Sequence, residues 1–339
     1  MLSIGYRAAL RGSIATFSGL IHHHNVHFRL GKSGFSAALI TLLFVHYLSA
    51  RAGVIDDVRV QLAQNNYSAA EAELRDYKAQ RGVTPEYLEA LSWMGRGAAS
   101  LGQWSQAAAY ASETRRLSER ELTKRKLDAE PHLPIALGAA YEVLAEGMAE
   151  KGQHAQAVSL LRAALARYGN TSIAARLQKN LNLLSLVGQP APPLQETQYL
   201  GPKPPVLASL KGSPVLLFFW AHWCADCKAE IPIIVRVRQE FAAQGLVVIG
   251  PTQLYGYAAH GADATPEQER AYIESVRQRY YSSLLDMPAP LSQKNFNAYG
   301  ASTTPTLVVL NRAGQVAMYH PGAMPYEELR AALQKVVAR

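Results

Sequence analysis

Two cysteines in one short motif carry the most specific chemical signal of the chain. They are the only cysteines among 339 residues, and they stand three positions apart as Cys224 and Cys227. Residues three apart on a helix share one face, so the two sulfur atoms can lie close enough to form a disulfide. Cys224 would occupy the helix N-terminus, where unpaired N–H groups and the dipole favour its thiolate. We therefore expect Cys224 to attack a substrate disulfide and Cys227 to resolve the mixed disulfide.

A zinc site is the alternative function of such a cysteine pair. Structural zinc requires four Cys or His ligands at suitable spacing, and the chain has no further cysteine. The position of the pair between a strand and a helix favours redox chemistry. We expect no metal and no cofactor.

The residues around the motif predict an α/β domain. Residues 214–221 are a continuous apolar run that leads into the cysteines, as in a strand buried on both faces. An amphipathic helix follows the cysteines, and residues 246–249 predict a second buried strand. This unit is parallel and places the cysteines at the carboxyl end of the first strand. Residues 306–310 and 315–319 predict a β-hairpin, and residues 326–337 a last helix.

An internal repeat precedes this domain. The segment Gly-Gln-Trp-Ser-Gln-Ala at 102–107 recurs as Gly-Gln-His-Ala-Gln-Ala at 152–157, with a weaker copy at 65–70. Apolar residues at helical spacing follow each copy, and amphipathic stretches at 87–101 and 137–149 precede the two clearer ones. A helix, a turn carrying Gly or Asn and a second helix form an αα-hairpin, in which the small residue permits a positive φ.

These hairpins resemble tetratricopeptide repeats, with a generic helical bundle as the alternative. The copies are offset by 37 and 50 residues, whereas that family's period is 34. We interpret the charged segment 113–130 within the longer interval as an extended or inserted helix. Trp104 and His154 share one repeat position and are expected to pack inside the hairpins. A stack of hairpins offers a concave face for a protein partner.

The C-terminal domain resembles the thioredoxin fold, and within it the TlpA/ResA group of exported thiol-disulfide oxidoreductases. The resemblance rests on four stretches: Gly188-x-x-Ala191-Pro192, Leu210-Lys211-Gly212, the run from Phe219 to Pro232 that contains both cysteines, and Thr303-Thr304-Pro305-Thr306. It implies that Cys224 is the nucleophile, that Cys227 resolves, and that the Thr304–Pro305 bond is cis and faces the cysteines. It also implies that Trp223, Thr304 and Pro305 contact the substrate. The reducing direction rests on this resemblance alone.

One position in the strand before the cysteines departs from plain thioredoxins. Phe218 stands where thioredoxins have a buried aspartate, so another group must accept the proton of Cys227. Glu230 is the candidate, because it lies one turn beyond Cys227 and the ResA-like group has a glutamate there; the alternative is a solvated helix glutamate. His222 could stabilise the thiolate as a cation, but we favour an exposed loop histidine.

The long connection at 251–268 is expected either to form part of the substrate groove or to cap the sheet.

The composition limits the partners. Hydrophobic residues make up 49% and charged residues 18% of the chain, which excludes global disorder. The net charge of +8 arises largely within residues 1–52, which hold five basic and no acidic residues, while the remainder has 29 basic against 26 acidic side chains. No basic stripe is left to follow a phosphate backbone, so we expect no nucleic-acid partner.

The N-terminal segment predicts export. Residues 33–50 carry no charge, Arg29 and Lys32 precede them, and Ala50-Arg51-Ala52 closes the segment. A basic stretch, an apolar stretch and small residues at the cut are typical of a secretory signal. The apolar run is shorter than the roughly 20 residues of a membrane helix. Cleavage after Ala52 and a periplasmic or other extracytoplasmic location are therefore favoured over a retained membrane anchor.

The sequence thus predicts an α plus α/β chain in three parts. These are a leader at 1–52, a helical repeat domain at 53–187 and a thioredoxin-like domain with a central mixed sheet at 188–339, beyond a proline-rich linker. The expected function is reduction or exchange of disulfides in client proteins, with electrons from a membrane thiol donor and a protein partner on the repeats. The alternatives are an assembly adaptor with an accessory redox module and a redoxin-type peroxidase, which would need threonine at Ala221.

Overall fold

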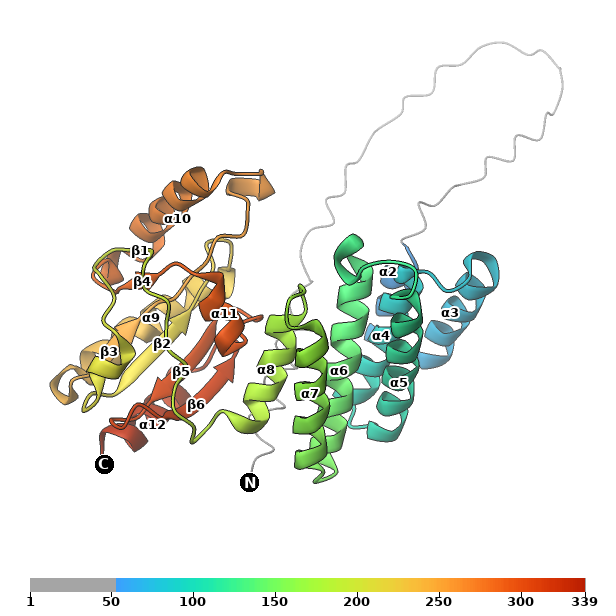
Figure 1. The fold of residues 1–339 in the computed structure, drawn as a ribbon, viewed down its shortest axis with the longest axis horizontal. Helices are drawn as coiled ribbons and strands as arrows, with labels where there is room; N and C mark the ends of the chain where they lie inside the picture. The colour runs from blue at the N-terminus through green and yellow to red at the C-terminus, as the bar shows by residue number, and fades with distance from the viewer. Residues whose placement is uncertain (1–52, 339) are drawn as a thin grey trace, which may run out of the picture.

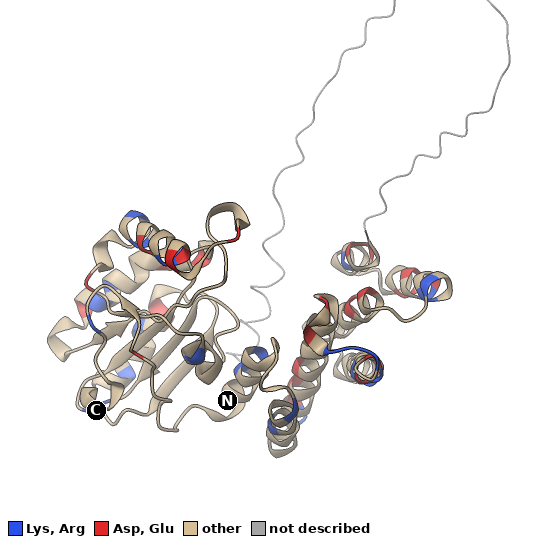
Figure 2. Ribbon diagram, turned by 45° about the horizontal axis from the view of Figure 1, so that its top comes forward, with Lys and Arg blue, Asp and Glu red and all other residues tan. Residues whose placement is uncertain are grey.

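The computed structural model describes residues 53–338. The predicted leader and the cleavage site after Ala52 lie outside the described residues. A helical region is followed along the chain by an α/β region built on a mixed sheet (Figure 1). The predicted fold class is therefore confirmed. Acidic and basic residues are interspersed along the helices of both regions (Figure 2), and no helix within residues 53–338 is long and apolar enough to cross a membrane.

The helical region is a series of helical hairpins closed by a single helix. Its elements are α2 (Val54–Ala63), α3 (Tyr67–Arg81), α4 (Pro85–Ser100), α5 (Trp104–Glu121), α6 (His132–Glu150), α7 (His154–Tyr168) and α8 (Ala174–Ser185). The residues that follow each repeat turn at helical spacing are buried, as the periodicity indicates: Ala70, Leu74, Ala107, Ala111, Ala157, Leu161 and Ala164. They fill the space between paired helices, and the alanines allow these helices to approach closely.

The three repeat turns have the same backbone geometry. Asn65, Gly102 and Gly152 adopt positive φ angles of 56°, 71° and 76°. In each turn the N–H of the next residue donates to a carbonyl five positions earlier, from Asn66 to Gln61 (2.9 Å), from Gln103 to Ala98 (2.9 Å) and from Gln153 to Met148 (2.8 Å). This bond closes the first helix and requires a left-handed residue before the donor, which explains the Gly or Asn of the repeat.

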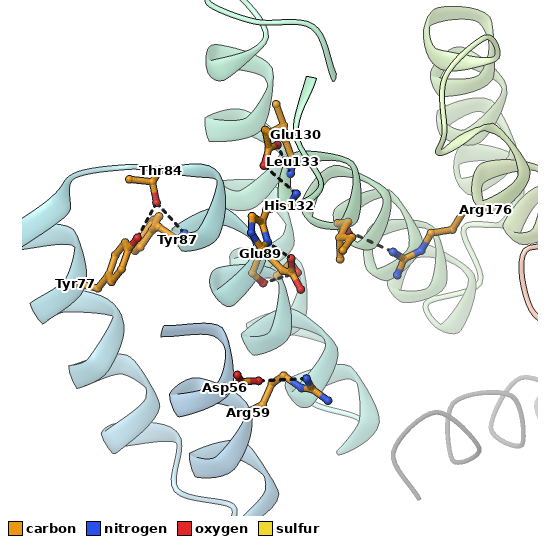
Figure 3. Close-up of polar contacts among 12 residues, drawn as sticks. Asp56, Arg59, Tyr77, Thr84, Tyr87, Glu89, Glu130, His132, Leu133 and Arg176 are labelled. Carbon is orange, nitrogen blue, oxygen red and sulfur yellow. Dashed lines mark hydrogen bonds and ion pairs between the residues drawn. The ribbon is translucent and has the colours of Figure 1, made fainter. Parts of the chain in front are cut away.

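Two expectations for the helical region are wrong in part. The segment 113–130 continues α5 only to Glu121 and then leaves the α-helix, returning as a short 3-10 helix at Leu127–Ala129. Glu130 then caps α6, because its carboxylate accepts from the N–H groups of His132 (2.9 Å) and Leu133 (2.6 Å) (Figure 3).

The second correction concerns the shared repeat position. Trp104 packs beside Ala98, Ala107 and Val143 as expected, with its ring close to Gly147 near the end of α6. His154 is exposed instead. The helix that follows its hairpin, α8, has 12 residues against the 19 of α6. It therefore lacks the later turns that would cover His154.

The α/β region is a four-stranded sheet with helices on both faces. The strand order is β3 (Val247–Ile249), β2 (Val215–Phe219), β5 (Thr306–Leu310) and β6 (Val316–Pro321). β2 and β3 are parallel, and the other neighbouring strands are antiparallel. A small second sheet joins β1 (Tyr199–Leu200) to β4 (Ala289–Pro290). The predicted parallel unit and hairpin are thus present, with β6 extending to Pro321.

Alternating side chains of the central strands divide the domain into two cores. Leu216, Phe218, Leu307 and Val309 pack with apolar residues of α9 (Ala225–Glu240), α10 (Pro266–Tyr280) and α12 (Tyr326–Val337). On the other face, Val215, Leu217, Phe219 and Val308 pack with Phe296 and Tyr299 of α11 (Gln293–Tyr299). This alternation is the expected consequence of a strand covered on both faces.

The helix α8 belongs to both regions. Leu177 and Leu181 lie in the core of the helical hairpins. Leu183, in the same helix, and Leu186, which follows it, pack with the core on the α11 side of the sheet. The backbone of Gly300 packs closely against α8, because a Cβ added to Gly300 would lie 2.2 Å from the backbone nitrogen of Lys179. One helix therefore joins the two packed regions.

Candidate active site

The cysteine pair lies where β2 passes into α9. Cys224 is the N-cap residue of α9, and its Sγ accepts the N–H of Cys227 at 2.9 Å. The two sulfur atoms are 2.09 Å apart, as a disulfide, and the Cα atoms are 5.3 Å apart. The spacing argument from the sequence is confirmed, because a single helical turn brings the two sulfurs together.

Both cysteines are buried in this oxidised form. Cys224 is 3% exposed and Cys227 is 0% exposed, so Cys224 is only marginally more accessible than its partner. The neighbouring Trp223 is 49% exposed, and its ring meets the ring of Tyr255 edge to face at 5.5 Å. The surface beside the cysteines therefore offers an accessible indole flanked by a tyrosine.

Thr304 and Pro305 lie at the same edge of the sheet as the cysteines. Thr306, which follows them, pairs with Phe219 at the end of β2, directly before the cysteine motif. The Thr304–Pro305 peptide bond is cis, as the family resemblance implied. The hydroxyl of Thr304 is buried without a hydrogen-bond partner within the described residues. Their role in binding substrate stays a prediction.

Glu230 is buried on the same face of α9 as Cys227 and is 3% exposed. This contradicts the alternative of a solvated helix glutamate. Burial raises the pKa of Glu230 to about 7, the N–H of Met324 opposes that rise by donating at 3.1 Å, and the nearby charge of Asp226 adds to it. A carboxyl group with this pKa exchanges protons near neutral pH, as a proton acceptor for a thiol must.

Phe218 replaces the aspartate of thioredoxins with an apolar core residue. It is fully buried in the same cluster as Cys227 and Ile234. No acid stands at this position to take the proton of Cys227, which leaves Glu230 as the buried acid on the motif's own helix face.

His222 is buried, and the expectation of an exposed loop histidine is wrong. It is 1% exposed, and its Nε2 lies 3.2 Å from Oε1 of Glu269, which is fully buried. Burial lowers the pKa of His222, although the carboxylate of Glu269 opposes that shift. The neutral imidazole therefore donates its Nε2–H to Glu269. Glu269 lies 47 positions later in the sequence on α10, so no local pattern around the cysteines reveals the pair.

Glu269 also fixes the long connection at 251–268. One carboxylate oxygen accepts the N–H of Tyr255 (2.6 Å) and the other accepts the N–H of Gly256 (2.8 Å). The start of this connection is thereby held against the residue pair that precedes Cys224. The connection therefore lies beside the cysteine motif at its start, and its role in a substrate groove stays a prediction.

Comparisons with known proteins agree with the fold and the cysteine pair. Residues 205–337 match the family of thioredoxin-like domains. The thioredoxin-like protein YneN of Bacillus subtilis is 29% identical over 148 residues, 43% of this chain and 78% of YneN. The thiol-disulfide oxidoreductase ResA of Bacillus thuringiensis is 26% identical over 150 residues, 44% of this chain and 78% of ResA.

Among solved structures, a thiol:disulfide interchange protein of Chlorobium tepidum is 21% identical, covers 44% of this chain and 96% of its own, and has a TM-score of 0.34. The family match and the sheet topology define the C-terminal region as a thioredoxin-like domain. The domain carries a C-x-x-C pair at disulfide distance and is similar to ResA, a thiol-disulfide oxidoreductase.

Proposed function

We propose that the protein is an exported reductase of disulfides in client proteins, supplied with electrons by a membrane thiol donor, with the helical region binding a protein partner. The observation that carries the proposal is the arrangement on α9. A cysteine at the helix N-cap is bonded to a second cysteine, and a buried glutamate with a pKa of about 7 follows on the same face. These are the parts required to attack a disulfide and then to resolve the product.

The reaction begins from the reduced pair. The thiolate of Cys224 attacks one sulfur of the client disulfide, which forms a mixed disulfide and releases one client thiolate. Glu230 takes the proton of Cys227, and the resulting thiolate attacks Sγ of Cys224. This step forms the Cys224–Cys227 disulfide and releases the second client thiolate, so two electrons pass from the cysteine pair to the client. A dithiol donor then reduces Cys224–Cys227 by the same exchange.

Trapping mixed disulfides tests this function. Cys227→Ala keeps the attacking sulfur and removes the resolving one, so in the native envelope it should accumulate covalent adducts with client proteins. Cys224→Ala is the matched control and should trap none. Purified wild-type protein should reduce insulin with dithiothreitol as the electron source. Partners that bind both variants equally and without a covalent link would instead favour the adaptor function, and turnover of peroxide with no disulfide reduction would favour the peroxidase.

The location is tested at the N-terminus of the mature protein. An apolar stretch closed by Ala50-Arg51-Ala52 supports cleavage after Ala52, so the mature chain should begin at Gly53 in the extracytoplasmic fraction. N-terminal sequencing of protein from fractionated cells checks both points. An intact leader on membrane-bound protein would reject cleavage and favour the anchored alternative.

A further inference from the structure

The thiol chemistry does not use the buried pair His222–Glu269. The carboxylate of Glu269 receives donors from both sides: the backbone N–H groups of Tyr255 and Gly256, and the ring Nε2 of His222. A buried carboxylate with several donors is held firmly, because loss of any donor leaves a charge that water cannot reach. The pair therefore joins the cysteine motif, the connection after β3 and the first turn of α10.

Aromatic rings surround the imidazole at this junction. The ring of His222 meets those of Tyr255, Tyr257 and Tyr272 edge to face, at centroid distances of 5.6, 5.3 and 5.3 Å. Tyr255 also meets the exposed ring of Trp223, the residue directly before Cys224. The stretch 253–257, termed here the aromatic loop, thus packs against the two residues that lead into the nucleophile.

We propose that His222 and Glu269 are positioning residues that hold the aromatic loop against Trp223, so that the loop forms one wall of the client site and covers the sulfur of Cys224. The inference deepens the proposed function and rests on it for the client. The wall would favour a polypeptide disulfide, because an indole and tyrosines give a chain large, rigid and partly apolar contacts. It would also keep small reagents from Cys224, consistent with the 3% exposure of that residue.

A pair of substitutions at His222 separates positioning from mere stability. His222→Leu removes the donor to Glu269, whereas His222→Gln keeps an N–H donor on a side chain of similar reach. Loss of a hydrogen bond to a buried charge corresponds to roughly a tenfold change in the equilibrium constant for holding the loop in place. In His222→Leu, the KM for a protein disulfide should rise about tenfold with kcat nearly unchanged, and small-reagent alkylation of reduced Cys224 should accelerate about tenfold. His222→Gln should restore both values toward those of the wild type.

A matched control lies on the same turn of α10. Glu267→Gln removes one negative charge from an exposed side chain two positions before Glu269, and it should leave KM and alkylation at wild-type values. If His222→Leu, folded by circular dichroism, also keeps both values within twofold of the wild type, the positioning role is rejected. A parallel fall in kcat for protein and small disulfides alike would reject it too, because that result indicates damage to the thiols themselves.

The unsubstituted full chain gives a test that does not depend on variant folding. The proposal predicts that the amide hydrogens of Tyr255 and Gly256 exchange at least tenfold more slowly than those of the exposed residues His260 and Asp263, because both donate to a buried carboxylate. Exchange at the rate of His260 and Asp263 would overturn the proposal. Exchange and alkylation are measured without a client, so protected amides in a protein that fails to reduce insulin would reject the proposed function and leave the loop contact standing.

Discussion

Glu230 lies one helical turn after Cys227 on the buried face of α9, and the two side chains are 3% and 0% exposed. A buried thiol cannot pass its proton directly to bulk water, and a carboxyl group within the same apolar core offers a nearby acceptor. The same burial raises the pKa of Glu230 to about 7. This relationship gives the first two predictions.

Glu230→Gln should slow the resolving step about a hundredfold and leave the attack of Cys224 nearly unchanged, because general base assistance contributes roughly that factor. In the wild type, the rate of resolution should rise with pH as Glu230 loses its proton near pH 7. Rapid mixing of reduced protein with a chromogenic peptide disulfide resolves the two steps. Equal resolution rates in both proteins from pH 6 to pH 8 would make Glu230 a structural residue only.

Glu230 should also make stability depend on pH. Its folded pKa of about 7 exceeds the ordinary value of 4.5, so the folded chain keeps a proton that the unfolded chain releases. Stability from this group is present below about pH 4.5 and is lost as the pH rises to about 7, by on the order of 3 kcal/mol. Between pH 5 and pH 8, the unfolding free energy of the wild type should therefore fall relative to that of Glu230→Gln. Urea denaturation at the two values checks this, and a constant difference would contradict it.

The two thiols should differ in reactivity when reduced. Cys224 occupies the N-cap of α9, where the helix dipole and free N–H groups lower the pKa of a thiol, whereas Cys227 lies within the first turn. If the pKa of the Cys224 thiol is one unit below that of Cys227, its alkylation near neutral pH is about tenfold faster. The single-cysteine variants Cys227→Ala and Cys224→Ala allow the rates of the remaining thiols to be compared directly. Faster labelling of Cys227 would reverse the assignment of nucleophile and resolving residue.

Substitutions at two of the repeat turns should differ in their effect on stability. Gly152→Ala places a Cβ on a residue with a φ of 76°, with no atom within 4 Å of it, so the cost of about 1 kcal/mol is purely conformational. Asn65→Gly relieves the same strain at a φ of 56° and should be neutral or slightly stabilising. Denaturant unfolding of each full-length variant measures both effects. A stable Gly152→Ala would show that the turn can adopt another conformation.

The helical region should fold as a fragment. Its main apolar core is formed entirely by residues between Val54 and Leu184, so residues 53–187 contain every side chain of that core. The fragment should show the circular dichroism of a largely helical protein and a cooperative thermal transition. A spectrum of random coil would mean that the region requires the sheet domain.

Local patterns in the sequence account for much of the fold. The run 215–219 is apolar without interruption because β2 is covered on both faces, and the repeat turns are visible because a positive φ selects Gly or Asn. The cysteine motif could be placed at the start of α9 for the same reason, since three-residue spacing and helix position are both local properties.

Contacts between distant segments could not be predicted in this way. The burial of His222 depends on Glu269, which lies in the first turn of α10. The sequence pattern of α10 is that of an ordinary surface helix and does not single out this acid. The two-residue strands β1 and β4 pair over about 90 positions and are too short to leave a periodic pattern. α5 ends at Glu121, inside a charged stretch whose composition does not change where the helix ends. For His222 and for the β1–β4 pair, the deciding partner lies elsewhere in the chain.

The place of α8 in two cores has a thermodynamic consequence. Unfolding α8 would expose Leu181 on the hairpin side and release Leu183 and Leu186 from the sheet side. Neither region can lose this helix without removing apolar contacts from the other, so the free energies of the two regions are coupled rather than independent. In the intact chain, tightening of one region by a bound partner would therefore also raise the resistance of the other to heat and denaturant.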